Sequence, residues 1–169
     1  KLLIFSIMPL VGIAQGFQPI AGYNYGAGNM RRVRDAVKIA NVTVVSIALV
    51  YFTVVMLFPR AVFGIFTTDQ ALLDTGATAL RIISLAIALV GLQLVGAVFF
   101  QSVGMAGPAL VLGLLRQAIL LIPLVLVLPR FFGVLGVWWA FPIADAIAAL
   151  VTVIWLRREM KQLHIVDSA

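Results

Sequence analysis

The sequence contains no cysteine, and it has one histidine, His164, among 169 residues. Without cysteine the chain can form neither a disulfide nor a reactive thiolate. Because the one histidine lies in a polar tail, a histidine-based metal site or a catalytic triad cannot be assembled. The glycine-rich stretch Gly26-Ala27-Gly28 lacks the lysine and the spacing of a phosphate-binding loop. These absences predict that the chain is not an enzyme, has no metal site and needs no organic cofactor.

Charged residues are also scarce, at 11% of the chain, whereas 63% of it is hydrophobic and its mean hydropathy is +1.16. The few charges separate long apolar runs, which is the pattern expected when lipid is the solvent. The formal net charge of +6 does not indicate nucleic-acid binding, because its carriers lie at the ends of apolar runs. The composition therefore predicts an all-α, polytopic bundle of transmembrane helices whose partner is the lipid bilayer.

Five apolar runs are long enough to cross about 30 Å of hydrocarbon at 1.5 Å of helix rise per residue. The third run is longer than the bilayer requires, so its first turns should protrude or tilt steeply. The chain opens without methionine inside an apolar run, which we interpret as a fragment whose N-terminal part is missing. We expect spans over residues 2–25, 37–58, 70–103, 109–128 and 134–156, in one transmembrane domain over 1–158, followed by a cytoplasmic tail over 159–169.

Lysine and arginine are distributed unequally between the two ends of these spans. Five crossings joined by short loops place the loop after the first span and the C-terminal tail on the same side. The other side has only Arg60, Arg130 and arguably Arg81. The positive-inside rule therefore places the richer side, and with it the C-terminus, in the cytoplasm. The basic residues of that side are Arg31, Arg32, Arg34, Lys38, Arg157, Arg158 and Lys161.

Two ionisable residues, Arg116 and Asp145, fall within the expected spans. Ionisable groups inside a membrane are costly, and they mark paired or functional sites. From the cytoplasmic ends of their helices, Arg116 lies at a depth of about 11 Å and Asp145 at about 17 Å. A short turn joins the two helices, so they should be neighbours. The two residues could form a charge-neutralising pair, or Asp145 could be a protonatable or cation-binding carboxylate on a transport pathway.

Other polar residues and several prolines complete the set of candidate functional positions. Buried amides more often bridge helices than touch substrate, so they rank below Asp145. Prolines inside apolar runs offer hinge points between transport states. The candidate cavity-lining amides are Gln15, Gln18, Asn24, Gln93, Gln101 and Gln117, and the candidate hinges are Pro9, Pro19, Pro123 and Pro142.

One stretch, QPIAGYNYGAGNMRRVRDAVK, resembles the signature that closes the second helix of the C-terminal half of multidrug and toxic compound extrusion (MATE) transporters. Further matches follow in order along nearly the whole chain. The resemblance is greatest to the bacterial branch of DinF-like and MepA-like exporters. The collinear matches are Leu57-Phe58-Pro59, Phe66-Thr67-Thr68-Asp69, Phe100-Gln101-Ser102-Val103-Gly104, Leu114-Leu115-Arg116-Gln117 and Gly136-Val137-Trp138 with Pro142-Ile143-Ala144-Asp145.

This resemblance implies twelve helices in two six-helix lobes, of which the chain covers the last five. It also implies an antiporter of the bacterial inner membrane that exports amphipathic or cationic, drug-like compounds in exchange for H⁺ or Na⁺. The partner would be the missing N-terminal lobe of the same protein, without which we expect no transport. The third span has no acid at membrane depth, so no cation ligand of the family can be assigned to this chain.

Two other functions remain open at this stage. A flippase for lipid-linked oligosaccharides, from the same superfamily, would line its cavity with several cationic groups, whereas only Arg116 lies within a span here. A non-transporting scaffold subunit would instead show a dry, closely packed helix interface without a polar cavity.

Overall fold

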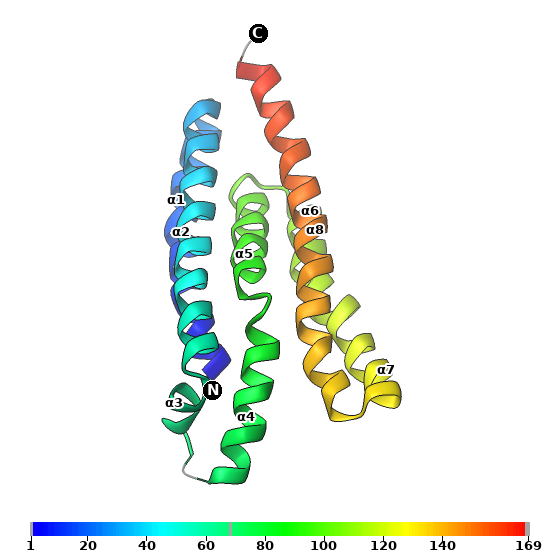
Figure 1. The fold of residues 1–169 in the computed structure, drawn as a ribbon. Coiled ribbons are helices and arrows are strands. Elements are labelled where there is room, and N and C mark those ends of the chain that lie inside the picture. Colours follow the sequence, from blue (N-terminus) through cyan, green and yellow to red (C-terminus); the bar gives the residue numbers. More distant parts are fainter. Residues whose placement is uncertain (1, 68, 168–169) are drawn as a thin grey trace.

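The computed structural model describes residues 2–67 and 69–167, and these residues form helices, turns and short loops without a strand. Figure 1 shows an elongated bundle whose long helices run side by side. The prediction of an all-α fold is confirmed. The elements are α1 (Leu2–Gly26), α2 (Met30–Leu57), α3 (Pro59–Gly64), α4 (Gln70–Ser84), α5 (Ile87–Ser102), α6 (Ala106–Leu114), the π-helix η1 (Leu115–Leu121), α7 (Ile122–Phe132) and α8 (Val134–Asp167).

Four single helices are long and apolar enough to cross a membrane, and the bent pair α4–α5 supplies a fifth crossing. The five regions correspond to the five apolar runs of the sequence. Apart from the central helix α5, most of their side chains are not buried inside the bundle. Only 6% of the most apolar window of the α6–α7 segment is buried, for example. This arrangement suits a bundle whose outer surface is in contact with lipid.

The turn between α1 and α2 closes where the sequence changes from apolar to basic. Gly28 adopts a positive φ of 74°, and the N–H of Asn29 donates to the carbonyl of Asn24 at 2.8 Å. Helix α2 then begins at Met30, several residues before the expected position 37. Arginine and lysine are good helix formers, so the helix continues into the polar region that hydropathy had assigned to the loop.

The third span is bent, whereas the sequence suggested one continuous helix over 70–103. The segments Leu72–Ser84 and Ile87–Ser102 meet at an angle of 46°. Neither proline nor glycine stands at the break around Leu85 and Ala86, so no residue type in the sequence marks it. The N–H of Leu85 donates to the carbonyl of Ile82 at 3.2 Å, which is a turn bond and not an α-helical bond.

The fourth span contains a second departure from α-helical geometry. It begins at Ala106 and ends at Phe132, beyond both ends of the expected span 109–128, and its middle is the π-helix η1. Pro123 follows directly, in the first turn of α7. Proline has no N–H, and its ring clashes with the carbonyl four residues earlier in an α-helix. The wider π turn before Pro123 accommodates both effects.

Helix α8 extends well past the expected span 134–156 and ends at Asp167, so most of the segment expected as a tail is helical. Pro142 lies inside this helix, and Pro9 and Pro19 lie inside α1, all without interrupting the helices. The hinge role of these three prolines therefore stays a prediction. The interruptions that the structure does contain are the α4–α5 bend and η1.

Helix α5 lies at the centre of the bundle and packs against α1, α2, α6 and α8. Its buried side chains, among them Val95 and Phe99, join the core contributed by α1 and α2. Helix α8 approaches α5 at Gly96, where an added Cβ would lie 2.2 Å from the Cγ2 of Thr152. Small residues allow the backbones of transmembrane helices to approach closely. Such packing is needed for their association, because lipid offers no hydrophobic driving force between helices.

Replacing Gly96 with alanine should therefore destabilise the protein by about 1–3 kcal/mol. Thr152 would have to turn its methyl group away and lose the bond that its Oγ1 donates to the carbonyl of Ala148 at 2.8 Å. The matched control is Gly12→Ala, because a Cβ at Gly12 meets nothing within 4 Å. Alanine there should be neutral or stabilising, by up to about 1 kcal/mol. Unfolding of both variants in detergent measures the difference, and equal stability would contradict the close α5–α8 contact.

Candidate functional site

The two charges that the sequence places inside the membrane form an ion pair in the structure. Arg116 comes from η1 and Asp145 from α8, and the Nε of Arg116 donates to the Oδ1 of Asp145. The Asp145 side chain is 4% exposed, whereas the Arg116 side chain is 26% exposed. The pairing that the sequence allowed is thus present, and the carboxylate is the more deeply buried partner.

A third residue joins the pair from the central helix. Gln93 of α5 is buried, and its Nε2 donates to the backbone carbonyl of Asp145 at 2.7 Å. This bond connects α5 to α8 at the residue that carries the buried charge. Three elements far apart in the sequence therefore meet at one point. Of the six amides predicted from the sequence, Gln93 is the one that contacts Asp145.

A cavity of about 190 Å³ opens beside the pair, between α1, α5, α6 and η1. Its polar lining consists of Gln93, Arg116 and Gln117, and the remaining lining residues are apolar or glycine, such as Ile7 and Leu112. Arg116 contacts both the cavity and Asp145. While both groups are ionised, the pair has no net charge, which lowers the cost of placing each charge inside the bundle.

The remaining predicted amides are distributed elsewhere. Asn24 is buried on α1, and its Nδ2 donates to the carbonyl of Ile20 on the same helix at 2.8 Å. It lines a separate cavity of about 380 Å³ between α1 and α2, together with Arg32 and Asp35. Gln15 and Gln101 are exposed, and Gln18 is partly exposed. The structure thus brings Gln93 and Gln117 to the charge pair and leaves the other four away from it.

The π-helix is the feature of the site that sequence reasoning missed. Arg116 and Gln117 both lie in η1. A π-helix closes its hydrogen bonds over five residues instead of four, so it changes the directions of the side chains that follow; such segments occur frequently at functional sites. Pro123 was the available signal, because a proline near mid-span requires some local change in the helix. Hydropathy alone does not report the hydrogen-bond register.

No group of three or more metal-ligating side chains lies together in the part of the chain that the structure describes. The site consists of the Asp145 carboxylate, the Arg116 guanidinium and the amides of Gln93 and Gln117. It belongs to a polytopic helical membrane protein with a charged pair inside the bundle.

Comparison with known proteins gives the family. The MatE family model matches residues 1–127. The multidrug export protein MepA of Staphylococcus aureus (strain NCTC 8325 / PS 47) is 27% identical over 161 residues, which cover 94% of this chain and 35% of MepA. The chain belongs to the MatE family of multidrug and toxic compound extrusion proteins, which are transporters and not enzymes. It spans about a third of the length of these curated relatives.

Solved structures agree with this assignment. The MATE multidrug transporter DinF-BH, solved as a complex with a ligand, is 43% identical, with a TM-score of 0.86 over 93% of this chain and 35% of that chain. A MATE transporter in the bent conformation has a TM-score of 0.91 at 22% identity, over 99% of this chain and 37% of that chain, and it supports the fold alone. The family expected from the sequence motifs is confirmed.

The ion pair makes a clear prediction about stability. Arg116→Gln leaves the buried Asp145 carboxylate unpaired and should destabilise the protein by about 3–5 kcal/mol. Asp145→Asn leaves the partly exposed Arg116 unpaired and should cost less. Replacing both residues, with leucine and methionine, should restore most of that loss because no charge remains. The control is Gln117→Ala, an exposed neighbour in the same π-helix.

Thermal or denaturant unfolding in detergent, arranged as a double-mutant cycle, measures the coupling between the two residues. Strictly additive losses in the double variant would show that the two side chains act independently, against the structure.

Proposed function

We propose that this chain is the C-terminal-lobe part of a secondary active multidrug efflux antiporter. The intact protein would export amphipathic or cationic compounds through the bacterial inner membrane in exchange for H⁺ or Na⁺. The proposal is supported by family membership and by the names of the relatives, which include a multidrug export protein and a multidrug transporter. No nucleic-acid partner or organic cofactor is needed for this activity.

The observation that carries the proposal is the ion pair between Arg116 and Asp145 beside a mainly apolar cavity that also has three polar lining side chains. While Asp145 holds Arg116, the pair is neutral and a cationic compound can approach. When Asp145 binds H⁺ or Na⁺ instead, Arg116 retains an uncompensated positive charge at the cavity wall. That charge disfavours a cationic compound, so the coupling ion and the exported compound exclude each other. Mutual exclusion is the thermodynamic requirement of an antiporter.

The fold comparisons suggest that this part of the protein moves as one unit. The chain matches MATE structures in the inward-facing and outward-facing conformations with TM-scores of 0.88 and 0.90, each over 96% of its length, at 24% and 23% identity. Alternating access arises when one such unit rocks against another. We therefore expect the 169 residues alone not to transport, and the N-terminal lobe to be the required partner.

The proposed orientation places the basic end of the bundle in the cytoplasm. In Figure 1 the α1–α2 turn and the C-terminal end of α8 lie at one end of the bundle, whereas α3, the start of α4 and the α7–α8 turn lie at the other. The first end includes Arg31, Arg32 and Arg158, all exposed. This grouping of basic residues is the one that the positive-inside rule requires for a cytoplasmic C-terminus.

The two alternatives receive less support. A flippase for lipid-linked oligosaccharides would need several cations at its cavity, and the cavity described here is lined by one arginine, which is paired with Asp145. A scaffold subunit would have a dry interface, whereas three polar side chains line this cavity.

The coupling role can be tested with Asp145→Asn in the intact transporter. Efflux of a cationic dye from cells, or its uptake into everted vesicles, should fall at least about tenfold, and the remaining transport should lose its response to a pH or Na⁺ gradient. Glu159→Gln, a carboxylate change near the cytoplasmic end of α8, is the control and should leave both properties intact. The 169-residue chain alone should give no efflux. Unaltered transport with unaltered ion dependence in Asp145→Asn would remove Asp145 as the coupling site.

The orientation can be tested with single cysteines, because this part of the protein contains none. In an otherwise cysteine-free intact transporter, Ala27→Cys in the α1–α2 turn should react with a membrane-impermeant maleimide only in everted vesicles. Thr67→Cys, between α3 and α4, should react only in intact cells. The opposite labelling pattern would invert the proposed topology.

A further inference from the structure

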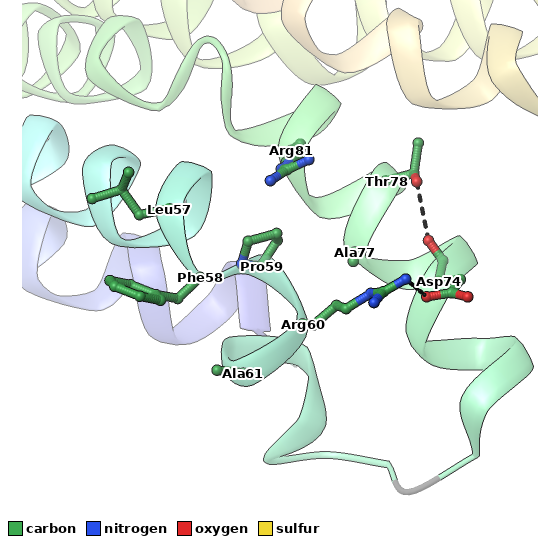
Figure 2. A pocket seen from close by; sticks show the side chains of 9 residues that line it. All are labelled: Leu57, Phe58, Pro59, Arg60, Ala61, Asp74, Ala77, Thr78 and Arg81. Atoms are coloured by element: carbon green, nitrogen blue, oxygen red, sulfur yellow. Dashed lines mark hydrogen bonds and ion pairs between the residues drawn. The ribbon is translucent and has the colours of Figure 1, made fainter.

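The largest cavity among those described lies away from the charge pair, at the end of the bundle opposite the C-terminus. Its volume is about 610 Å³, and its walls come from the end of α2, from α3 and from α4. Figure 2 shows its lining side chains, with the Arg60 side chain reaching Asp74 and Arg81 further along α4, towards the rest of the bundle. The cavity is separate from the proposed transport site.

The depth of this cavity in the membrane follows from α2. From Ile39 to Leu57 this helix contains no charged residue, and 19 residues of helix span about 28 Å, close to the thickness of the hydrocarbon region. Leu57 therefore lies where the hydrocarbon meets the headgroups. Arg81 is held at the same level, because its Nη2 donates to the carbonyl of Met56 at 3.1 Å.

The cavity contains two arginines and one aspartate, and the contacts described here use only some of their hydrogen-bonding atoms. The Nη2 of Arg60 and the Oδ1 of Asp74 are 2.6 Å apart, and their side chains are 74% and 62% exposed. This contact uses one of the two carboxylate oxygens of Asp74. Arg81 uses one of five N–H donors for the Met56 carbonyl. Two guanidinium groups and one carboxylate therefore face the headgroup region, with one positive charge in excess.

We propose that this cavity binds the headgroup of phosphatidylethanolamine. Its phosphate lies between Arg60 and Arg81, since guanidinium groups bind phosphate with paired, charge-assisted hydrogen bonds. Its primary ammonium donates to the Oδ2 of Asp74. The start of the acyl chains lies along Leu57 and Phe58, which are 65% and 61% exposed at the mouth of the cavity. Each charged group of the cavity and of the headgroup then contacts at least one group of opposite charge, with the phosphate shared by the two arginines.

The same chemistry distinguishes this lipid from others. The quaternary ammonium of phosphatidylcholine has no N–H to donate to Asp74. Phosphatidylglycerol has the phosphate but no cation, so it leaves the carboxylate with Arg60 alone. On the orientation proposed above, the bound lipid belongs to the outer leaflet.

Native mass spectrometry of the intact, delipidated protein in detergent tests the proposal, with the three lipids titrated separately. Phosphatidylethanolamine should bind about tenfold more tightly than phosphatidylcholine, which has the same net charge but no N–H to donate to Asp74, because tenfold is the size of one charge-assisted hydrogen bond. Arg81→Gln should weaken its binding about tenfold, and Asp74→Asn should remove the preference over phosphatidylcholine. Arg130→Gln is the control, because this exposed arginine lies in the last turn of α7 at the same end of the bundle. It should bind all three lipids as the wild type does.

Equal affinity of the wild-type protein for phosphatidylethanolamine and phosphatidylcholine would overturn the proposal, and this measurement needs no variant to fold. An equal loss of binding in Arg130→Gln and Arg81→Gln would also overturn it, since the effect would then be general surface charge. Soluble glycerophosphoethanolamine separates a lipid from a free phosphodiester: binding as tight as that of the lipid would make the cavity a site for a soluble ligand and overturn the lipid assignment. Unfolding temperatures measured without lipid verify that the variants are folded.

Discussion

The ion pair between Arg116 and Asp145 is the interaction on which this bundle depends most. An ionised side chain left alone in hydrocarbon costs several kcal/mol, so the elements that carry these charges, η1 and α8, are required to meet. Gln93 adds α5 to the same point through the backbone of Asp145. Elsewhere, close packing holds the helices together, as at Gly96. Apolar side chains gain no hydrophobic free energy when they move from lipid into the bundle, so packing contacts have to supply the attraction. A polar contact thus specifies which helices are neighbours inside an otherwise apolar structure.

The same pair links structure to the proposed transport. In this proposal the Asp145 carboxylate pairs either with the Arg116 guanidinium or with H⁺ or Na⁺ from solution. The two states differ in the charge that Arg116 presents to the cavity. Arg116 lies in the π-helix, where it contacts the carboxylate and also lines the cavity, and the proposed exchange of partners would change the charge at the cavity wall.

Much of this could be predicted from the sequence because lipid imposes simple rules. Hydropathy located the five crossings, and helix rise placed Arg116 and Asp145 at similar depths on neighbouring helices. The bend at Leu85 and Ala86 could not be predicted, because no proline or glycine stands there. The ends of α2 and α8 could not be predicted from hydropathy either, because both helices continue beyond their apolar spans into polar residues. The choice of Gln93 among six amides depended on helix packing, which composition does not determine.

The central claim is that Asp145 holds either Arg116 or the coupling cation, and that the cationic compound and the coupling cation exclude each other. Proton release on binding of a cationic dye to the purified intact transporter tests this most directly, followed with a pH indicator in weakly buffered detergent solution and repeated with a Na⁺ electrode. Wild-type protein that is first loaded with H⁺ or Na⁺ should release that ion in proportion to the dye bound, and Asp145→Asn should release neither ion. Undiminished release from Asp145→Asn, or dye binding to the wild type without release of either ion, would contradict the central claim.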